Sequence, residues 1–319
     1  MRDWSSPAWL AEATDWLDER LIVAGLERTG GVVQHHLRPW ATTLRAPTTG
    51  GTVWLKAASP GTASEVGLYG VLAEAVPEAV LVPLAIDRER AWILLPDGGP
   101  TLGDRLGRAD AASELPAALA RYGALQRAVE PRADELLALG VADMRPAAMP
   151  GHYEHVLEIA AAGDRDLHER LAAGRTVVAE WCARLADAPG APSLDHNDLH
   201  PWNVLGNGDG YRFYDWGDAV VAHPFTVARV PLGYVRDAAG SEVAARDAYL
   251  EAFADLAPHG ELVETLELAC RVAKIARVLI WERSLRAALD EGVEVDATWL
   301  TAPLESAASI FDDDYLGGA

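Results

Sequence analysis

Residues 194–218 read LDHNDLHPWNVLGNGDGYRFYDWGD and are the most informative part of the chain. They include all three of its asparagines, Asn197, Asn203 and Asn207, and two of its nine histidines. Since asparagine occurs nowhere else in the chain, its use here indicates positions that need a neutral amide oxygen or a tight turn. The chemistry of the chain is therefore expected in this window.

A β-hairpin is predicted within this window. Residues 204–206 and 211–214 read as two short strands. Between them stands Asn207-Gly208-Asp209-Gly210, a sequence typical of hairpin turns because asparagine and glycine tolerate positive φ.

The hairpin brings polar side chains together. Folding about the turn sets Asn203 opposite Tyr214, so that Asp215 lies beside Asn203. Asp198 stands five residues before Asn203, on the loop that enters the first strand. Two adjacent oxygen ligands with a third carboxylate nearby suit a hard cation such as Mg²⁺ together with a separate base.

Length and composition narrow the class of protein. The 319 residues allow a large core and about two domains or lobes. No apolar run approaches the roughly 18–20 residues that span a bilayer, and the N-terminal segment reads as an amphipathic helix. Cys182 and Cys270, both in helical contexts, are read as buried thiols. A cytoplasmic enzyme without a membrane partner is expected.

The net charge of −21 argues against a nucleic-acid partner, because phosphates require a basic surface. A strongly acidic protein attracts cationic small molecules, so a cationic acceptor is one expectation. The alternative is that the acidity only keeps the protein soluble.

The predicted elements divide the chain into a small antiparallel β-rich part and a larger, mainly helical part, an α+β arrangement. The Pro96-Asp97-Gly98-Gly99-Pro100 segment is the expected linker, giving lobes at 1–96 and 97–319. Strands are predicted at 31–37, 43–46, 52–57, 81–86 and 91–95. Helices are predicted at 6–25, 62–75, 109–128, 132–140, 151–162, 165–187, 241–256, 259–289 and 297–311.

Lys56 is the second informative residue. The chain has 27 basic residues, but only Lys56 and Lys274 are lysines, so a lysine on a strand indicates a compact ammonium needed at one point, such as a phosphate contact. Glu65 has two interpretations. It either pairs with Lys56 from the following helix or completes a capping box with Thr62.

The motif His196-Asn197-Asp198-Leu199-His200-Pro201-Trp202-Asn203, followed by Asp215-Trp216-Gly217, resembles that of the aminoglycoside phosphotransferase and choline kinase-like family. Lys56, Glu65 and the linker occur in the order that this family shows. The resemblance implies a two-lobed, protein-kinase-like fold and a small-molecule O-phosphotransferase.

The resemblance also implies roles. Asp198 is the expected catalytic base, and Asn203 and Asp215 are the expected ligands of Mg²⁺ on the nucleotide phosphates. Lys56, steadied by Glu65, is expected to contact the α- and β-phosphates of ATP or GTP.

The resemblance places the adenine contact in the segment that precedes the linker. Residues 93–97 are the expected hinge, with Leu95 and Asp97 next to the base of the nucleotide.

Three features depart from the family pattern. Asn197 and Trp202 stand where glycine is common, and the expected nucleotide-covering turn, residues 38–43, has no glycine. Trp202 has two interpretations, a residue that narrows the pocket and a core residue. A non-catalytic nucleotide-binding module is therefore the alternative function, although the base and both metal ligands are intact.

His196 and His200 are read as structural residues of the loop. Their spacing invites a zinc site, but Pro201 interrupts the helix that such a site requires. For the acceptor, an aminoglycoside-type antibiotic or an amino sugar or amino alcohol, the candidate contacts are Asp218 and Glu282. Arg277 is read as part of a core scaffold in its helix.

Overall fold

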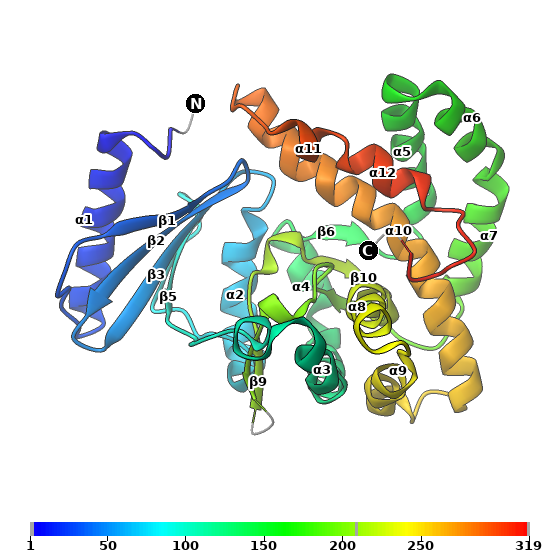
Figure 1. Ribbon diagram of the computed structural model, residues 1–319, viewed down its shortest axis with the longest axis horizontal. Coiled ribbons are helices and arrows are strands. Elements are labelled where there is room, and N and C mark those ends of the chain that lie inside the picture. Colours follow the sequence, from blue (N-terminus) through cyan, green and yellow to red (C-terminus); the bar gives the residue numbers. More distant parts are fainter. Residues whose placement is uncertain (1–2, 208–209, 318–319) are drawn as a thin grey trace.

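The computed structural model describes residues 3–207 and 210–317, which form a strand-rich part and a helical part (Figure 1). The strand-rich part is an antiparallel five-stranded sheet in the order β1-β2-β3-β5-β4. Its strands are β1 (Val33–Leu37), β2 (Ala41–Thr48), β3 (Gly51–Ala58), β4 (Ala85–Asp87) and β5 (Trp92–Pro96).

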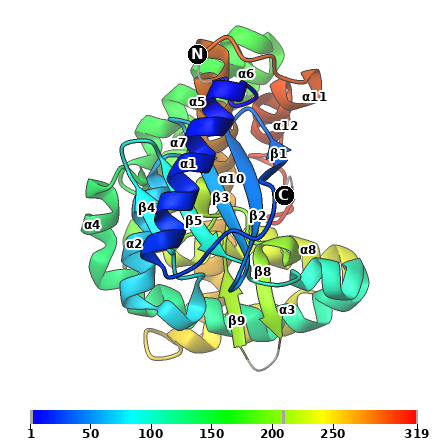
Figure 2. The same ribbon diagram turned by 90° about the vertical axis from the view of Figure 1, so that its left-hand side faces the viewer.

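Helix α1 (Pro7–Val23) covers the outer face of this sheet and crosses its strands (Figure 2). Ser6 is the N-cap of this helix, and its side chain accepts a hydrogen bond from the backbone N–H of Trp9. Leu17 and Leu21 face the sheet and pack with Leu55 and Leu94 in a core of their own. The sheet thereby gains a hydrophobic outer layer.

The second face of the sheet meets α2 (Ser64–Ala75), which lies between the sheet and the helical part (Figure 1). Its buried side chains belong to the core of the helical part. That part contains α3 (Leu102–Val129), α4 (Ala133–Ala138), α5 (Met149–Gly163), α6 (Arg165–Ala173), α7 (Arg175–Ala186), α8 (Arg229–Ala239), α9 (Val243–Leu250), α10 (His259–Asp290), α11 (Ala297–Leu300) and α12 (Ala302–Ala308).

Two small sheets lie within the helical part. One has the order β6-β10-β7, and the other pairs β8 with β9. Their strands are β6 (Ala142–Met144), β7 (Ser193–Asp195), β8 (Val204–Asn207), β9 (Gly210–Phe213) and β10 (Val220–Ala222). Short 3₁₀ helices are η1 (Pro77–Ala79), η2 (Glu130–Arg132), η3 (Pro201–Asn203), η4 (Trp216–Asp218), η5 (Pro224–Ala228) and η6 (Glu251–Phe253).

Helix α10 runs through the helical part and anchors the C-terminal segment. The ammonium of Lys274 is buried and donates hydrogen bonds to the backbone oxygens of Ser309 and Asp314, at 2.9 and 2.7 Å. The carboxylate of Asp314 pairs with Arg236 at 2.6 Å. The acidic residues 312–314 thus belong to a docked segment.

The predicted α+β arrangement is confirmed, with differences in detail. The predicted strand at 81–86 is wrong for most of its length, because only Ala85–Asp87 pairs with β5. The predicted helix at 165–187 divides at Gly174. Helix α8 was not predicted, because Pro231 and Gly233 interrupt its pattern. Cys182 and Cys270 are buried free thiols, as expected.

The predicted hairpin is confirmed in its strands, because β8 and β9 pair antiparallel with Val204 opposite Phe213. Two residues of the predicted turn, Gly208 and Asp209, lie outside the described residues. Within the described part of the chain, no helix is long and apolar enough to cross a membrane.

Packing of α1 on the sheet can be tested at Leu17, which is fully buried. Leu17→Ala should lower the free energy of unfolding by about 2–5 kcal/mol, because it removes buried methyl groups and leaves a cavity. Ile22→Ala is the matched control, since Ile22 on the same helix is 74% exposed. Urea unfolding measures both, and equal effects would contradict the packing of α1 described above.

Candidate active site

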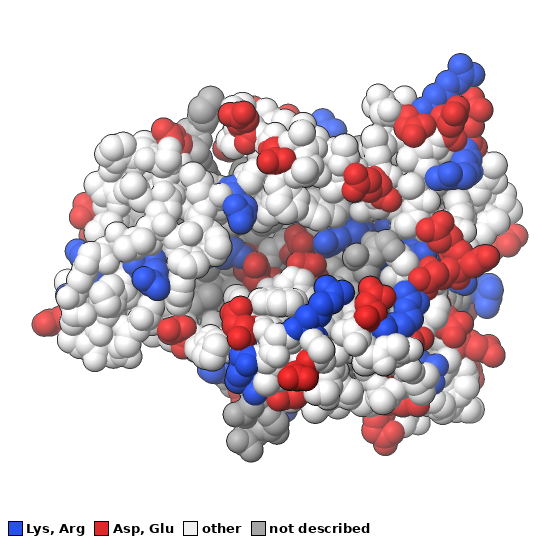
Figure 3. Space-filling view, in the orientation of Figure 1, with Lys and Arg blue, Asp and Glu red and all other residues white. Residues whose placement is uncertain are grey.

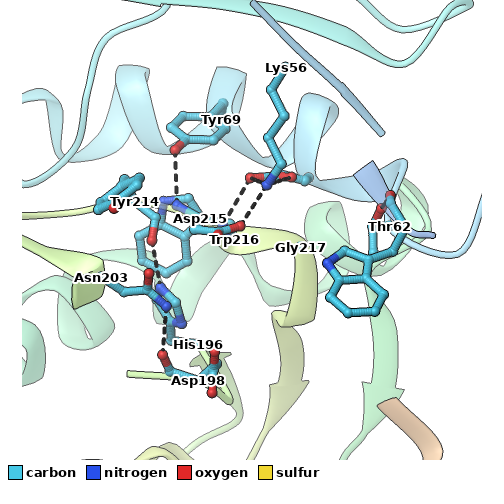
Figure 4. Close-up of polar contacts among 12 residues, drawn as sticks. Lys56, Thr62, Tyr69, His196, Asp198, Asn203, Tyr214, Asp215, Trp216 and Gly217 are labelled. Carbon is cyan, nitrogen blue, oxygen red and sulfur yellow. Dashed lines mark hydrogen bonds and ion pairs between the residues drawn. The ribbon is translucent and has the colours of Figure 1, made fainter. Parts of the chain in front are cut away.

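Lys56 joins three separate elements through its ammonium. From β3, its Nζ lies 2.7 Å from Oε2 of Glu65 on α2 and 2.6 Å from Oδ1 of Asp215, which follows β9 (Figure 4). Burial lowers the pKa of Lys56, but the charges of Asp215 and Glu65 outweigh it and hold the pKa above its usual value. Lys56 is therefore a fixed cation.

Glu65 is almost completely buried, and the ion-pair interpretation of this residue holds. Its carboxylate also accepts a hydrogen bond of 3.0 Å from the backbone N–H of Trp216. The capping-box interpretation is wrong, because α2 begins beyond Thr62 with no side-chain cap. The hydroxyl of Thr62 instead donates to the backbone oxygen of Trp40.

The backbone at Asp215 is left-handed, with φ of +63°, and the backbone N–H of Asp215 donates to the hydroxyl of the buried Tyr69. A non-glycine residue adopts this conformation only where its surroundings hold it. Here the conformation directs the carboxylate of Asp215 to Lys56, while the next N–H reaches Glu65.

The loop before β8 is closed by its own side chains (Figure 4). Nδ2 of Asn203 donates to the backbone oxygen of Asp198 at 2.9 Å. His196 is fully buried, and its Nε2 lies 2.9 Å from the backbone oxygen of Tyr214. The backbone N–H of Tyr214 donates a hydrogen bond to the backbone oxygen of Asn203 at 3.3 Å. Asp215, the next residue, therefore lies beside Asn203.

Asn197 occupies a second left-handed position, with φ of +63°. Asparagine tolerates this conformation better than most residues, so it can take a position where glycine is common. Its backbone N–H donates to Oδ1 of Asp195 at 2.7 Å, which fixes the turn.

Asp198 is held between the imidazole of His200 and the guanidinium of Arg277. Its Oδ2 lies 3.4 Å from Nε2 of His200, and its Oδ1 lies 3.5 Å from Nη2 of Arg277. Burial alone raises the pKa of Asp198, but His200 and Arg277 outweigh it and lower the pKa to about 2. The contact with Asp198 in turn raises the pKa of His200 against the effect of burial.

Asp218 lies on the other side of Arg277, whose Nη1 is 3.5 Å from its Oδ2. Burial, together with the nearby charge of Asp198, raises the pKa of Asp218 to about 6. Arg277 thus bridges two carboxylates that titrate over different ranges of pH.

Two connected cavities surround these groups. The first, of about 380 Å³, is named the hinge cavity because Leu95 and Asp97 line it. The second, of about 540 Å³, is named the Asp198 cavity and is also lined by Asp218 and Arg277. Lys56, Asp215, His36 and Thr43 line both cavities, so the two form one continuous cleft.

The glycine-free turn at 38–43 is fastened by contacts with other elements. The backbone oxygen of Trp40 accepts hydrogen bonds from the N–H of Ser59 and the hydroxyl of Thr62, both at 2.9 Å. The Trp40 ring meets Trp281 on α10 edge-on and Trp299 on α11 edge-on, with centroids 6.2 and 5.3 Å apart. The turn therefore spans from the sheet to the helical part.

Two predicted site residues lie away from the cleft. Trp202 packs over Gly103 at the start of α3, where an added Cβ would stand 2.5 Å from its ring, and it lines neither cavity. Glu282 pairs with Arg286 on the same helix and lies 3.8 Å from His155. Glu282 lines neither cavity, whereas Trp281, one position earlier on α10, lines the Asp198 cavity.

Oxygen donors suitable for Mg²⁺ are present. Because Nδ2 of Asn203 is engaged with Asp198, its Oδ1 is the side-chain atom left with lone pairs for a cation. The carboxylate of Asp215 is half exposed toward the cleft. In the described residues, no group of three His, Cys, Asp or Glu side chains is arranged as a metal site. Phosphate oxygens complete the coordination in sites of the Mg²⁺ type.

Several cleft residues were missed in the sequence. Arg277 was read as core scaffold because it shares a helix face with apolar residues. His36 belongs to none of the motifs described for the sequence, yet it lines both cavities. Only the contact across the cleft distinguishes these residues, and helical or strand spacing carries no such signal.

Comparison with known proteins shows the family of the chain. The profile of the phosphotransferase enzyme family matches residues 41–265, which cover more than half of the chain. The chain belongs to this family. No curated protein sequence matches the chain.

Solved structures of phosphotransferases share the fold. A macrolide 2′-phosphotransferase from Brachybacterium faecium is 20% identical, with a TM-score of 0.55 over 95% of this chain and 98% of that one. A choline kinase from Streptococcus pneumoniae is 14% identical, with a TM-score of 0.57 over 93% and 99%. A variant aminoglycoside 2′-phosphotransferase in complex with GDP is 13% identical, with a TM-score of 0.61 over 96% and 100%.

The family establishes the class of reaction and the fold. The chain is a small-molecule phosphotransferase with a kinase-like fold, as the motif at 196–203 predicts.

The shared ammonium of Lys56 can be tested by a double-mutant cycle. Lys56→Met should cost about 3–5 kcal/mol of unfolding free energy, because it leaves the buried Glu65 carboxylate unpaired. Lys56→Met combined with Glu65→Gln should recover much of this loss. Thermal and urea unfolding measure both, and strictly additive effects would contradict the pairing.

The raised pKa of Asp218 predicts a pH-dependent stability difference. The unfolded value is about 3.9. A carboxyl with a higher folded pKa favours folding while protonated, and that contribution is lost as pH rises from about 4 through about 6.

Asp218→Asn should therefore gain stability over the wild type by on the order of 1–3 kcal/mol between pH 4.5 and 7.5. The control is Asp134→Asn, since the Asp134 side chain is 97% exposed. Urea unfolding at the two values of pH measures the difference, and a pH-independent difference for Asp218→Asn would contradict the shift.

Proposed function

We propose that this phosphotransferase transfers the γ-phosphoryl group of ATP or GTP to a hydroxyl group of a small molecule. The observation that carries the proposal is that Lys56 lines one cavity together with Asp198 and Asp215, although it is far from both of them in the sequence. Phosphoryl transfer asks a protein chiefly for positioning and for neutralisation of charge.

The nucleotide is proposed to occupy the hinge cavity, with its base beside Leu95 and Asp97 and its phosphates toward Lys56. On this proposal, residues 1–96 form the nucleotide-binding lobe and residues 97–319 carry the catalytic loop and the acceptor. The GDP complex of the related aminoglycoside 2′-phosphotransferase supports a nucleotide co-substrate. Since nucleoside triphosphates are made in the cytoplasm, the reaction is placed there.

Asp198 is the proposed base. The acceptor hydroxyl oxygen attacks the γ-phosphorus, the bond from that phosphorus to the β–γ bridging oxygen breaks, and the nucleoside diphosphate leaves. Asp198 receives the hydroxyl proton. A pKa of about 2 makes Asp198 a weak base, so it orients the hydroxyl and takes the proton late, as a loose transition state allows.

Mg²⁺ is the proposed metal, held by Asn203 and Asp215. When bound, it supplies positive charge next to the phosphate oxygens. Lys56 is already fixed between Glu65 and Asp215, so it presents its charge to the phosphates without reorganisation.

The proposal predicts separate effects for the base and the metal ligand. Asp198→Asn should lower turnover by about 10²–10⁴-fold while nucleotide affinity stays within about twofold, because the base acts on the acceptor. Asp215→Ala should weaken Mg²⁺-dependent nucleotide binding as well as turnover. Release of ADP or GDP is measured with aminoglycosides, amino sugars, choline-like alcohols and nucleosides, and calorimetry measures nucleotide binding.

Asp134→Asn, an exposed substitution, is the control for both variants. Full turnover of Asp198→Asn would remove the base from the mechanism. Unchanged Mg²⁺-nucleotide affinity in Asp215→Ala would remove the metal site.

A further inference from the structure

Arg277 stands at the place where a cationic group of an acceptor would meet the catalytic carboxylate. Its guanidinium lies 3.5 Å from Asp198 on one side and 3.5 Å from Asp218 on the other. Its side chain is 14% exposed, so the ion pairs form in a largely desolvated setting. Both carboxylates of the acceptor side therefore already have a cation supplied by the protein.

Trp281 holds this guanidinium in place. The guanidinium carbon of Arg277 lies 5.0 Å from the centre of the Trp281 ring. Trp281 also meets Trp299 at 5.4 Å with a tilt of 33° between the rings. The face of a tryptophan ring binds cations well, but this face of Trp281 already carries the guanidinium of Arg277.

The local charge of the Asp198 cavity differs from that of the whole chain. Its described lining includes the carboxylates Asp198, Asp215 and Asp218 and the cations Arg38, Lys56 and Arg277. Figure 3 shows acidic and basic side chains next to each other in the hollow between the two parts of the molecule. In a chain of net charge −21, the Asp198 cavity thus has as many Lys and Arg residues as carboxylates in its described lining.

We infer that Arg277 is a built-in counter-ion for Asp198 and Asp218, and that the acceptor is uncharged where it meets these carboxylates. The inference rests on the proposed function, because it assigns the class of acceptor to the same cleft. The inference disagrees with the expectation of a cationic acceptor, which rests on the net charge of the chain. Long-range attraction brings cations to the surface, but Asp198 and Asp218 are already paired with Arg277.

A cationic acceptor would have to displace Arg277 from both carboxylates. Nη1 of Arg277 is buried and makes no hydrogen bond to any described residue. The negative charges of Asp198 and Asp218 therefore compensate for the burial of the guanidinium. Leaving a buried guanidinium without its counter-charges is strongly unfavourable. An uncharged acceptor with an apolar face meets no such barrier. It packs against the tryptophans that line the same cavity, Trp40, Trp281 and Trp299.

The test uses a cation and its uncharged isostere, ethylguanidinium and ethylurea, titrated into the full-length protein in about 0.15 M salt, which screens long-range attraction. In the wild type, calorimetry should find affinities within about threefold of each other. In Arg277→Ala, ethylguanidinium should bind at least about tenfold more tightly than ethylurea, because it replaces the missing side chain. Adding Asp218→Asn should reduce that preference.

Either of two results overturns the inference: a preference of tenfold or more for ethylguanidinium in the wild type, or no gained preference in Arg277→Ala. Arg277→Gln, which keeps most of the side chain, serves as the second variant if Arg277→Ala does not fold, and the wild-type measurement needs no variant.

A turnover assay extends the test with matched acceptors, choline against 3,3-dimethylbutan-1-ol and glucosamine against glucose. Faster turnover of the uncharged member supports the inference, and faster turnover of the cationic member overturns it. If no acceptor is phosphorylated, the proposed function fails while the calorimetric comparison still decides the role of Arg277.

Discussion

The shared ammonium of Lys56 is the interaction on which the rest of the structure depends. It joins the sheet, α2 and the segment after β9. Because Glu65 is buried, its carboxylate is tolerated only with this partner and the N–H of Trp216. The left-handed backbone at Asp215 is the local distortion that makes the meeting possible. The ion pairs of Lys56 thus determine both where the elements around the cleft meet and which charges lie there.

Local sequence predicts the parts of the site that are made locally. The strands of the β8–β9 hairpin place Asp215 beside Asn203 because pairing register follows from the strands themselves. The pairing of Lys56 with Glu65 was one of two interpretations, and only the observed start of α2 separates them. The site residues that the motifs predict lie either in the window 194–218 or on two successive elements, β3 and α2.

The cleft residues that the sequence did not predict come from distant elements. Arg277 has the spacing of a scaffold residue, and its charge acquires a role only when α10 passes Asp198. Glu282 is a predicted acceptor contact, yet its neighbour Trp281 lines the Asp198 cavity and Glu282 pairs with Arg286, because a sequence does not show which of two neighbouring positions on a helix faces inward. The sequence does not predict helix α8, because proline and glycine disfavour a helix. Packing of its apolar side chains in the core outweighs this effect.

The two lysines of the chain have a consequence for its chemistry with amine-reactive compounds. Lys274 is 1% exposed and holds the C-terminal segment, whereas Lys56 lies within the cleft with its side chain 15% exposed. With arginine as the surface cation elsewhere, acylating reagents find no freely exposed lysine side chain. Because its two ion pairs also keep the ammonium of Lys56 protonated, neither lysine side chain offers an acylating reagent an exposed, neutral amine.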